Sequence, residues 1–300
     1  MNYRIVTDGS CDLPPEFCKK KGVEVVPFYV SFDSESYQKE IVDIPIRTFY
    51  DQIVSDPTTY PKSSMPSVQD YVDVFTPIIQ EGKAIICICI TTKFSGSYQS
   101  AMNAKQMLLE SFPDAKITVL DSTINTVLQG LYVVEAVKLY EANVPYEKVI
   151  EELETIKSTG RIFFTVGSID YLQHGGRIGK LAGMAGSVLG IKPLITMKEG
   201  EIFSSGVARG RKKSLEKVYE LLWQYIQEVG ATIDTYSLCI GYGYDLEEGE
   251  EFRKGAIDFL NAKGFSIKDE QLPSYQIGAT ISVHTGPYPL GFGIIKRAKV

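Results

Sequence analysis

The stretch that decides the fold is Ala84-Ile85-Ile86-Cys87-Ile88-Cys89-Ile90, which is followed a few residues later by Ser95-Gly96-Ser97. A short, continuous apolar run of this kind is typical of a strand that is buried on both faces of a parallel sheet. In such a strand Cys87 and Cys89 share one face as small apolar side chains. We therefore expect a buried strand here, with a helix that starts near Tyr98.

Similar apolar runs alternate with helical patterns through the first half of the chain. The runs lie at residues 5–6, 23–30, 85–90 and 117–120, and the amphipathic patterns lie at residues 45–55, 67–80, 98–112 and 127–141. This rhythm predicts a parallel α/β sheet with helices on both faces. One more helix is expected at residues 146–157, before the stop signal Ser158-Thr159-Gly160.

The second half has the pattern of a separate, mixed α/β unit. Strands are expected at residues 162–166 and 236–241 and around residues 266–267 and 281–283, with a hairpin turn at 198–201 and helices at 212–229 and 247–262. The predicted fold class is therefore α/β with two domains, an N-terminal parallel domain at residues 1–160 and a C-terminal mixed domain at residues 161–300.

Composition and charge exclude several classes of partner. The chain has 300 residues, 44% of them hydrophobic, and a net charge of −6, so no basic surface argues for nucleic acid or for anionic lipid heads. We see no apolar leader and no run long enough to span a membrane, and therefore expect a cytoplasmic protein without stable membrane insertion. The five cysteines and two histidines form no paired metal-binding pattern, which predicts buried structural cysteines and no metal site.

Near the C-terminus the apolar run Ile281-Ser282-Val283 leads into His284-Thr285-Gly286-Pro287. We expect the run to be a strand whose end carries an imidazole and a hydroxyl into a turn that glycine leaves open. Such an arrangement can hold an anion, because histidine can be charged or donate a hydrogen bond. The alternative is a turn histidine that faces water.

Two serine-rich segments precede predicted helices. Ser95-Gly96-Ser97 follows the strand at residues 85–90, so it lies at the carboxyl ends of the strands, where ligands collect. In Lys62-Ser63-Ser64-Met65-Pro66-Ser67, Ser67 and Asp70 fit a capping box, which leaves Ser63 and Ser64 free to bind a ligand. An ordinary helix cap and an ordinary polar loop are the alternatives.

Taken together, these segments resemble the DegV family. The matching motifs occur in the family's order across nearly the whole chain: Thr7-Asp8-Gly9-Ser10-Cys11-Asp12, Ser63-Ser64-Met65-Pro66-Ser67, Phe94-Ser95-Gly96-Ser97, Gly175-Gly176-Arg177 and His284-Thr285-Gly286-Pro287. The chain departs from the family pattern at Ser63 (usually Thr), Met65 (usually Gln) and His174 (commonly Lys). We expect the hydroxyl at residue 63 to be kept and the rim of the site to differ.

The resemblance implies a non-enzymatic lipid-binding protein that buries one long-chain fatty acid between its two domains and needs no cofactor. It implies that Ser63, Ser95 and His284, here called the polar clamp, hold the carboxylate, with Ser64, Gly96, Ser97 and Thr285 nearby. It also implies a partner similar to dihydroxyacetone kinase, which converts the bound fatty acid to an acyl phosphate for phospholipid synthesis.

A glycine-rich segment offers a lining for the acyl tail. Residues 181–190 alternate small and large apolar side chains, and each glycine weakens a helix by about 1 kcal/mol relative to alanine unless close packing or a ligand needs the space. We expect Gly183, Ala185, Gly186 and Leu189 to border the tail. Tight helix packing is the alternative.

Two arginine sites have different predicted roles. Arg177 is expected to fix a turn by donating hydrogen bonds to carbonyl groups or a carboxylate. Residues 209–213 form a positive cluster on an acidic protein. Such a cluster can simply be solvated, but Arg209 and Arg211 could also contact an acidic partner or a phosphate, and the resemblance implicates Arg209 in the exchange with the kinase.

A serine hydrolase acting on a lipid ester is the alternative function. It would use Ser95 and His284 with an acid such as Asp121. The chain lacks the Gly-x-Ser-x-Gly motif around any serine, and Ser95 precedes a helix start that would bind an anion as readily as expose a nucleophile.

Overall fold

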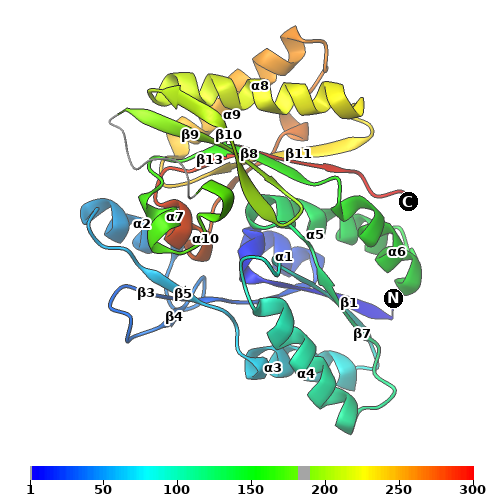
Figure 1. The fold of residues 1–300 in the computed structure, drawn as a ribbon. Helices are drawn as coiled ribbons and strands as arrows, with labels where there is room; N and C mark the ends of the chain where they lie inside the picture. Colours follow the sequence, from blue (N-terminus) through cyan, green and yellow to red (C-terminus); the bar gives the residue numbers. More distant parts are fainter. Residues whose placement is uncertain (1, 182–189) are drawn as a thin grey trace.

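The computed structural model describes residues 2–181 and 190–300 and contains two main sheets that lie on either side of a central helix (Figure 1). The first sheet has the strand order β2-β1-β6-β7, and all of its neighbouring strands run parallel. Its strands are β1 (Tyr3–Asp8), β2 (Val23–Val26), β6 (Ala84–Cys89) and β7 (Ile117–Asp121). The predicted parallel N-terminal sheet is confirmed.

Helices cover both faces of this sheet, as the alternation of its side chains requires. Ile85, Cys87 and Cys89 pack against α3 (Val68–Gln80) and α4 (Ser97–Ser111). Ile86 and Ile88 point the other way, toward the core that the sheet shares with the helices on its opposite face. Those helices are α1 (Pro15–Lys21), α5 (Thr126–Glu141) and α6 (Tyr146–Lys157). All five cysteines are buried and free, as predicted.

The second sheet is mixed and has the order β10-β9-β8-β13-β11-β12, in which only β11 and β12 pair in parallel. Helices α8 (Arg211–Val229) and α9 (Leu246–Ala262) cover its outer face at the top of Figure 1. Its strands are β8 (Arg161–Thr165), β9 (Ile191–Lys198), β10 (Glu201–Arg209), β11 (Tyr236–Tyr242), β12 (Ser274–Gln276) and β13 (Leu290–Lys296).

A small antiparallel sheet, of order β4-β3-β5, lies beside these layers. It consists of β3 (Tyr29–Ser31), β4 (Gln38–Lys39) and β5 (Lys62–Ser64). The remaining helices and 3-10 turns are η1 (Gly9–Cys11), α2 (Ile46–Ser55), α7 (Asp170–His174), η2 (Gly179–Leu181), η3 (Asp269–Gln271) and α10 (Ala279–Thr285).

Helix α5 joins the two sheets into one core. Twelve of its sixteen residues are buried, because it packs against β1 on one side and against β11 and β13 on the other. Leu128 and Leu131 belong to a single apolar cluster that also includes Ile86 of the first sheet and Ile295 of the second. A helix that is hydrophobic all round must be covered on all sides, and this one is covered by both sheets.

The predicted strand at residues 23–30 is wrong in one respect, because the chain forms two strands there. β2 ends at Val26 and joins the parallel sheet, while β3 begins at Tyr29 and joins the small antiparallel sheet. Pro27 lies between them and has no backbone N–H to donate to a ladder, so the pairing changes at this point.

The predicted strand at residues 281–283 is also wrong, because these residues lie within helix α10. Six of the seven residues of α10 are buried. A short apolar run that is buried on every side has the same composition in a helix as in a central strand, so periodicity alone does not separate the two. His284 is therefore in the last turn of a helix and not at the end of a strand.

The last strands of the second sheet also differ from the prediction. No strand forms at residues 266–267, where Ser266 has a left-handed φ of 54°. The sheet instead uses β12 and β13, and β13 was missed because its two glycines give no strand signal. Gly293 has a packing role there, since an added Cβ would lie 3.1 Å from the Cβ of Leu128 on α5.

We predict that Leu128→Ala lowers the free energy of unfolding by about 3 kcal/mol, because Leu128 is 0% exposed between the two sheets. Urea unfolding followed by circular dichroism measures this loss and should show a single transition, since both sheets share α5. Leu246→Ala, at a side chain that is 56% exposed, is the control and should change the stability by no more than about 0.5 kcal/mol. Two well-separated transitions in the wild-type protein would contradict the shared core.

Candidate functional site

Two residues of the polar clamp, Ser63 and His284, are in contact although they are 221 positions apart in the sequence. His284 lies in the last turn of α10, and its Nε2 atom is 3.1 Å from the Oγ atom of Ser63. Ser63 is the middle residue of β5, where it pairs with Val30 of β3. The two residues meet because α10 packs against the small antiparallel sheet.

The third residue of the clamp lies in the loop between β6 and α4. Helix α4 begins at Ser97 with Gly96 as its N-cap, as the sequence predicted within one residue. Ser95 Oγ accepts a hydrogen bond of 3.1 Å from the Ser97 N–H. The Ser97 hydroxyl turns into the core, where it lies 2.7 Å from Asp8 Oδ2 and 2.6 Å from the Tyr71 hydroxyl. Ser95 can reach a ligand, whereas Ser97 holds the loop in place.

A cavity of about 240 Å³ brings these segments together. Its polar side carries the three clamp residues with Ser64 and Arg177, and its other walls come from α10, from the start of α5 and from the second sheet. Other lining residues come from α7 and from the segments that follow β2, β5 and β6. The apolar residues of the whole lining are Phe28, Met65, Ile90, Phe94, Phe164, Leu172, Ile202 and Ile281.

A second hollow of about 40 Å³ continues the cavity into the seam between the two sheets. The two spaces share five lining residues, Asn125, Phe164, Ile202, Ile281 and Thr285. Beyond them the wall is almost entirely apolar, with residues such as Val127, Met197 and Phe292. A path therefore leads from a polar mouth into an apolar interior. The predicted tail-lining residues Gly183, Ala185, Gly186 and Leu189 lie outside the described residues.

His284 is a neutral hydrogen-bonding group in this environment. Burial, with a smaller contribution from the positive charge of Arg177, lowers its pKa to about 4. Its Nδ1 atom is buried, has no hydrogen-bond partner among the described residues and faces Gly175, where an added Cβ would collide with it. The imidazole therefore contributes a directed hydrogen bond at Nε2 rather than a positive charge.

Arg177 fixes a turn at the edge of the cavity, as the sequence predicted. Its Nη1 donates to the Gly175 carbonyl at 2.8 Å and its Nε donates to the Phe94 carbonyl at 3.2 Å. The guanidinium thereby joins the Gly175-Gly176-Arg177 turn to the loop that carries Ser95. Beside this turn, the rings of His174 and Tyr60 stack with their centroids 3.6 Å apart.

Three other lining residues differ from the prediction or were missed. Thr285 uses its hydroxyl within its own helix, donating to the Ile281 carbonyl at 3.2 Å. Thr280 was not predicted, although it lies one turn before His284 on the same face of α10 and lines the cavity. Its Oγ1 is buried and has no partner among the described residues. Asn125 was missed too, and a helical reading of residues 279–285 would have identified Thr280.

The two arginines of the positive cluster have different environments. Arg209 is exposed at the end of β10 and makes no ion pair within residues 2–181 and 190–300. Arg211 forms a two-point ion pair with Glu248, with both N–O distances 2.7 Å. Arg209 is therefore the one that is free to contact a partner.

The groups that a serine hydrolase would need are not assembled. His284 contacts Ser63 rather than Ser95, and its Nδ1 has no carboxylate partner in the described part of the chain. Asp121 accepts from the Thr92 hydroxyl at 2.7 Å and from the Thr123 N–H at 2.9 Å, and it does not line the cavity. The geometry gives Ser95 no activating base.

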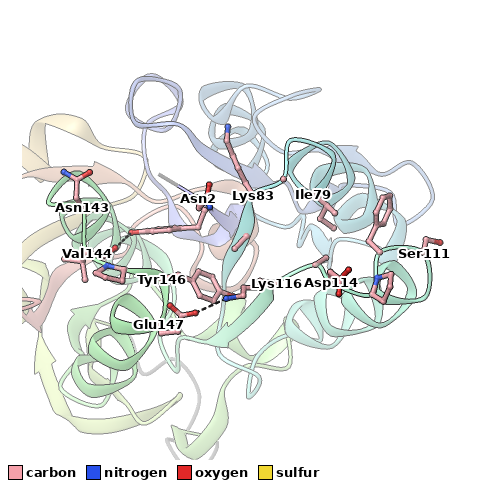
Figure 2. Close-up of a pocket in the computed structure, with 17 residues that line it drawn as sticks. Asn2, Ile79, Lys83, Ser111, Asp114, Lys116, Asn143, Val144, Tyr146 and Glu147 are labelled. Carbon is pink, nitrogen blue, oxygen red and sulfur yellow. Dashed lines mark hydrogen bonds and ion pairs between the residues drawn. The ribbon is translucent and has the colours of Figure 1, made fainter.

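A larger hollow, of about 930 Å³, lies at the opposite edge of the first sheet (Figure 2). It surrounds the amino ends of β1, β6 and β7 and is open to solvent. Two of its polar contacts are the ion pair of Lys116 with Glu147 at 3.1 Å and the hydrogen bond that the Tyr3 hydroxyl donates to the Val144 carbonyl. Ligands of parallel sheets bind at the carboxyl ends, so this hollow is the weaker candidate.

Metal sites and membrane-spanning helices can also be assessed in the part of the chain that the structure describes. Within it, no group of three or more histidine, cysteine, aspartate or glutamate side chains is arranged to hold a metal ion. In the same residues, no helix is both long and apolar enough to cross a membrane.

The fold is that of a two-layer α/β protein whose sheets share a helix, and hydroxyl and imidazole groups lie at the mouth of the apolar seam between them. Residues 2–297 match the model of a family described as uncharacterised proteins of the DegV family. A DegV domain-containing protein of Clostridium perfringens is 31% identical over 298 residues, which cover 99% of this chain and all of that protein. The chain belongs to the DegV family.

Two solved structures are similar over almost the whole chain. A stearic acid-binding protein from Eubacterium ventriosum is 44% identical with a TM-score of 0.92, and the match covers 98% of each chain. A fatty-acid-binding DegV family protein from Thermus thermophilus is 30% identical with a TM-score of 0.86, and the match covers 99% of this chain and all of that one. The two-domain α/β fold of the family is therefore the fold of this chain.

We predict that His284 titrates with a pKa of about 4 in the ligand-free protein, measured from its ring nitrogen shifts by NMR in a His174→Asn background that leaves one histidine. An unfolded histidine has a pKa of about 6.5. The unfolded chain therefore takes up a proton below this value that the folded protein excludes, so the contribution of His284 to stability falls as the pH drops from 6.5 to 4. A pKa at or above 6.5 would contradict the buried, neutral imidazole.

Proposed function

We propose that this protein binds one long-chain fatty acid, with the carboxylate held by Ser63, Ser95 and His284 and the tail in the seam between the two sheets. The observation that carries the proposal is the contact between Ser63 and His284 at the mouth of a cavity whose interior is apolar. The similar proteins described as binding fatty acids support it.

The hydrogen bonds of the clamp fit a carboxylate. If Nε2 of the neutral His284 ring carries the hydrogen, it donates to Ser63 Oγ, and the Ser63 hydroxyl then donates to a ligand oxygen. Ser95 already accepts from the Ser97 N–H, so its hydroxyl hydrogen is available to the second oxygen. This tautomer leaves Nδ1 as an unpaired acceptor.

Affinity and orientation come from different parts of the ligand. Moving a chain of about sixteen carbons out of water contributes on the order of 12 kcal/mol before ordering costs, so the tail supplies most of the affinity. A buried carboxylate without donors is strongly disfavoured, so the clamp decides which end of the ligand remains at the mouth. Arg177 adds a positive charge at the same edge.

A fatty acid bound with its carboxylate at the mouth of the cavity can be presented to an enzyme that acts on the carboxylate. The tail is enclosed, and the carboxylate is the part of the ligand that a partner can reach. We propose that a kinase similar to dihydroxyacetone kinase phosphorylates the carboxylate, giving an acyl phosphate for phospholipid synthesis. In this scheme the chain presents the substrate and is not itself the catalyst, and the exposed Arg209 contacts the kinase or the transferred phosphate.

The fatty-acid proposal predicts that the purified protein, once denatured and extracted, releases about one fatty acid per chain by mass spectrometry. Ser95→Ala should weaken binding of a fluorescent fatty acid by about tenfold, because it removes one hydrogen bond to a charged group. Ser111→Ala, at an exposed serine at the far end of helix α4, is the control and should bind normally. Extraction of no acyl compound, with no binding of added fatty acid, would reject the proposed ligand.

The presentation proposal predicts that Arg209→Ala retains its fatty acid but supports acyl phosphate formation at less than about a tenth of the normal rate when it is mixed with the kinase and ATP. Lys254→Ala, which removes a positive charge on α9, is the control. Acyl phosphate formation at the wild-type rate by the Arg209 variant would remove this residue from the partner surface.

A further inference from the structure

Three buried carboxylates lie behind the polar clamp. Asp8, Asp12 and Glu40 are 0%, 9% and 2% exposed, and none of them pairs with a lysine or arginine of the described residues. Burial raises the pKa of each one. They do not line the cavity. Groups that cost so much to bury need a structural reason, and their hydrogen bonds provide it.

Asp8 holds the loop that carries Ser95. Its Oδ2 atom accepts from the Ile90 N–H at 2.9 Å and from the Ser97 hydroxyl at 2.7 Å, so it binds both ends of that loop. Its Oδ1 atom accepts from Gln129 of α5 at 2.8 Å.

Glu40 and Asp12 hold the beginning of α10. Glu40 Oε2 accepts from the Thr280 N–H at 3.0 Å, and its Oε1 accepts from the Phe28 N–H at 3.3 Å. Asp12 accepts from the Thr126 hydroxyl at 2.6 Å and lies against Gly278, the residue before α10. An added Cβ on Gly278 would collide with Asp12, so the backbone must approach the two carboxylates closely.

The position of α10 sets the position of His284. Thr280 and His284 are one helical turn apart, so a shift of the first turn moves the imidazole as well. On the other side, the Tyr50 hydroxyl holds the same helix through Ser282 Oγ at 2.6 Å and the Ile277 carbonyl at 2.9 Å.

Glu40 has the stricter hydrogen-bonding requirement of the two carboxylates at α10. Both of its partners are backbone N–H groups, which can only donate, so both carboxylate oxygens must accept. Asp12 faces one hydroxyl, which can reverse its hydrogen bond and accept instead. Replacing Glu40 by glutamine would place an NH2 group against one of the two N–H groups, whereas the same change at Asp12 can be accommodated.

We propose that Glu40 is a positioning residue for fatty-acid binding, which fixes the first turn of α10 so that His284 Nε2 meets Ser63 Oγ. This inference rests on the proposed function and adds a residue that does not touch the ligand. Glu40 binds the Thr280 N–H and so holds α10, and α10 in turn holds the His284 ring in the position that binding requires.

The test compares Glu40→Gln with Glu135→Gln. Glu135 is the control, because it is 1% exposed, accepts from the Ser237 hydroxyl at 2.8 Å and the Ala298 N–H at 3.0 Å, pairs with Lys138 at 2.6 Å, and does not line the cavity. Both variants lose a buried carboxylate. We expect Glu40→Gln to bind a fluorescent fatty acid about tenfold more weakly and to shift the Nε2 resonance of His284, and we expect Glu135→Gln to do neither.

The two readouts separate this inference from the proposed function. If the wild-type protein binds no fatty acid, the proposed function fails, but the His284 spectrum of Glu40→Gln still decides whether Glu40 positions the ring. Should Glu40→Gln fail to fold, Glu40→Asp keeps the charge but is one methylene too short to reach both N–H groups, and it should give the same shift. A His284 spectrum that changes no more in the Glu40 variants than in Glu135→Gln would overturn the inference.

Discussion

The architecture depends on the burial of α5. A helix that is apolar on every side is stable only if protein covers all of it, and neither sheet alone can do that. The second sheet therefore packs on the helix from the side opposite the first sheet. The seam between the sheets is filled along α5 by its side chains, and it opens where the helix begins, at Asn125, Thr126 and Val127. The position of the cavity follows from the position of this helix start.

In the proposed function, the clamp holds an anion at the edge of an apolar space. Its groups come from the short strand β5, the loop before α4 and the last turn of α10, so each is carried by a backbone that is hydrogen-bonded elsewhere. Burial keeps His284 neutral, so the ring acts through the direction of its hydrogen bond to Ser63, which in the proposed function orients the Ser63 hydroxyl toward the ligand. The charge at the mouth comes from Arg177, whose side chain is exposed. The hydrogen-bond donors of the clamp inside the cavity and the positive charge of Arg177 at its mouth favour a ligand whose acidic end stays near solvent.

Sequence reasoning succeeded where one local pattern decides the structure. Three features were predicted because each depends on residues only a few positions apart. They are the buried strand β6, the helix start at Gly96 and Ser97, and the capping box of Ser67 and Asp70. Sequence reasoning failed where residues far apart in the sequence determine the local structure. The helical form of residues 279–285 depends on packing against α2, α7 and β3. Likewise, the Ser97 hydroxyl turns inward because Asp8, 89 residues earlier, lies beneath it. The division of the chain near residue 160 stays a prediction: β8 begins at Arg161, and α10 returns to pack against the first half.

The size of a hollow does not decide whether it is a site in this fold. In the larger space, at the amino ends of the first sheet, some polar side chains already have partners, as Lys116 has Glu147 and Tyr3 has the Val144 carbonyl, so a ligand beside them would have to displace existing hydrogen bonds. The smaller space lies at the carboxyl ends, where the Ser63 and Ser95 hydroxyls and the imidazole of His284 converge, and where Thr280 Oγ1 is buried without a partner in the described chain. Unpaired polar groups are costly in a protein interior, and a ligand that pairs them recovers that cost. In the proposed function, a bound acid in the smaller hollow therefore lowers the free energy of the folded protein.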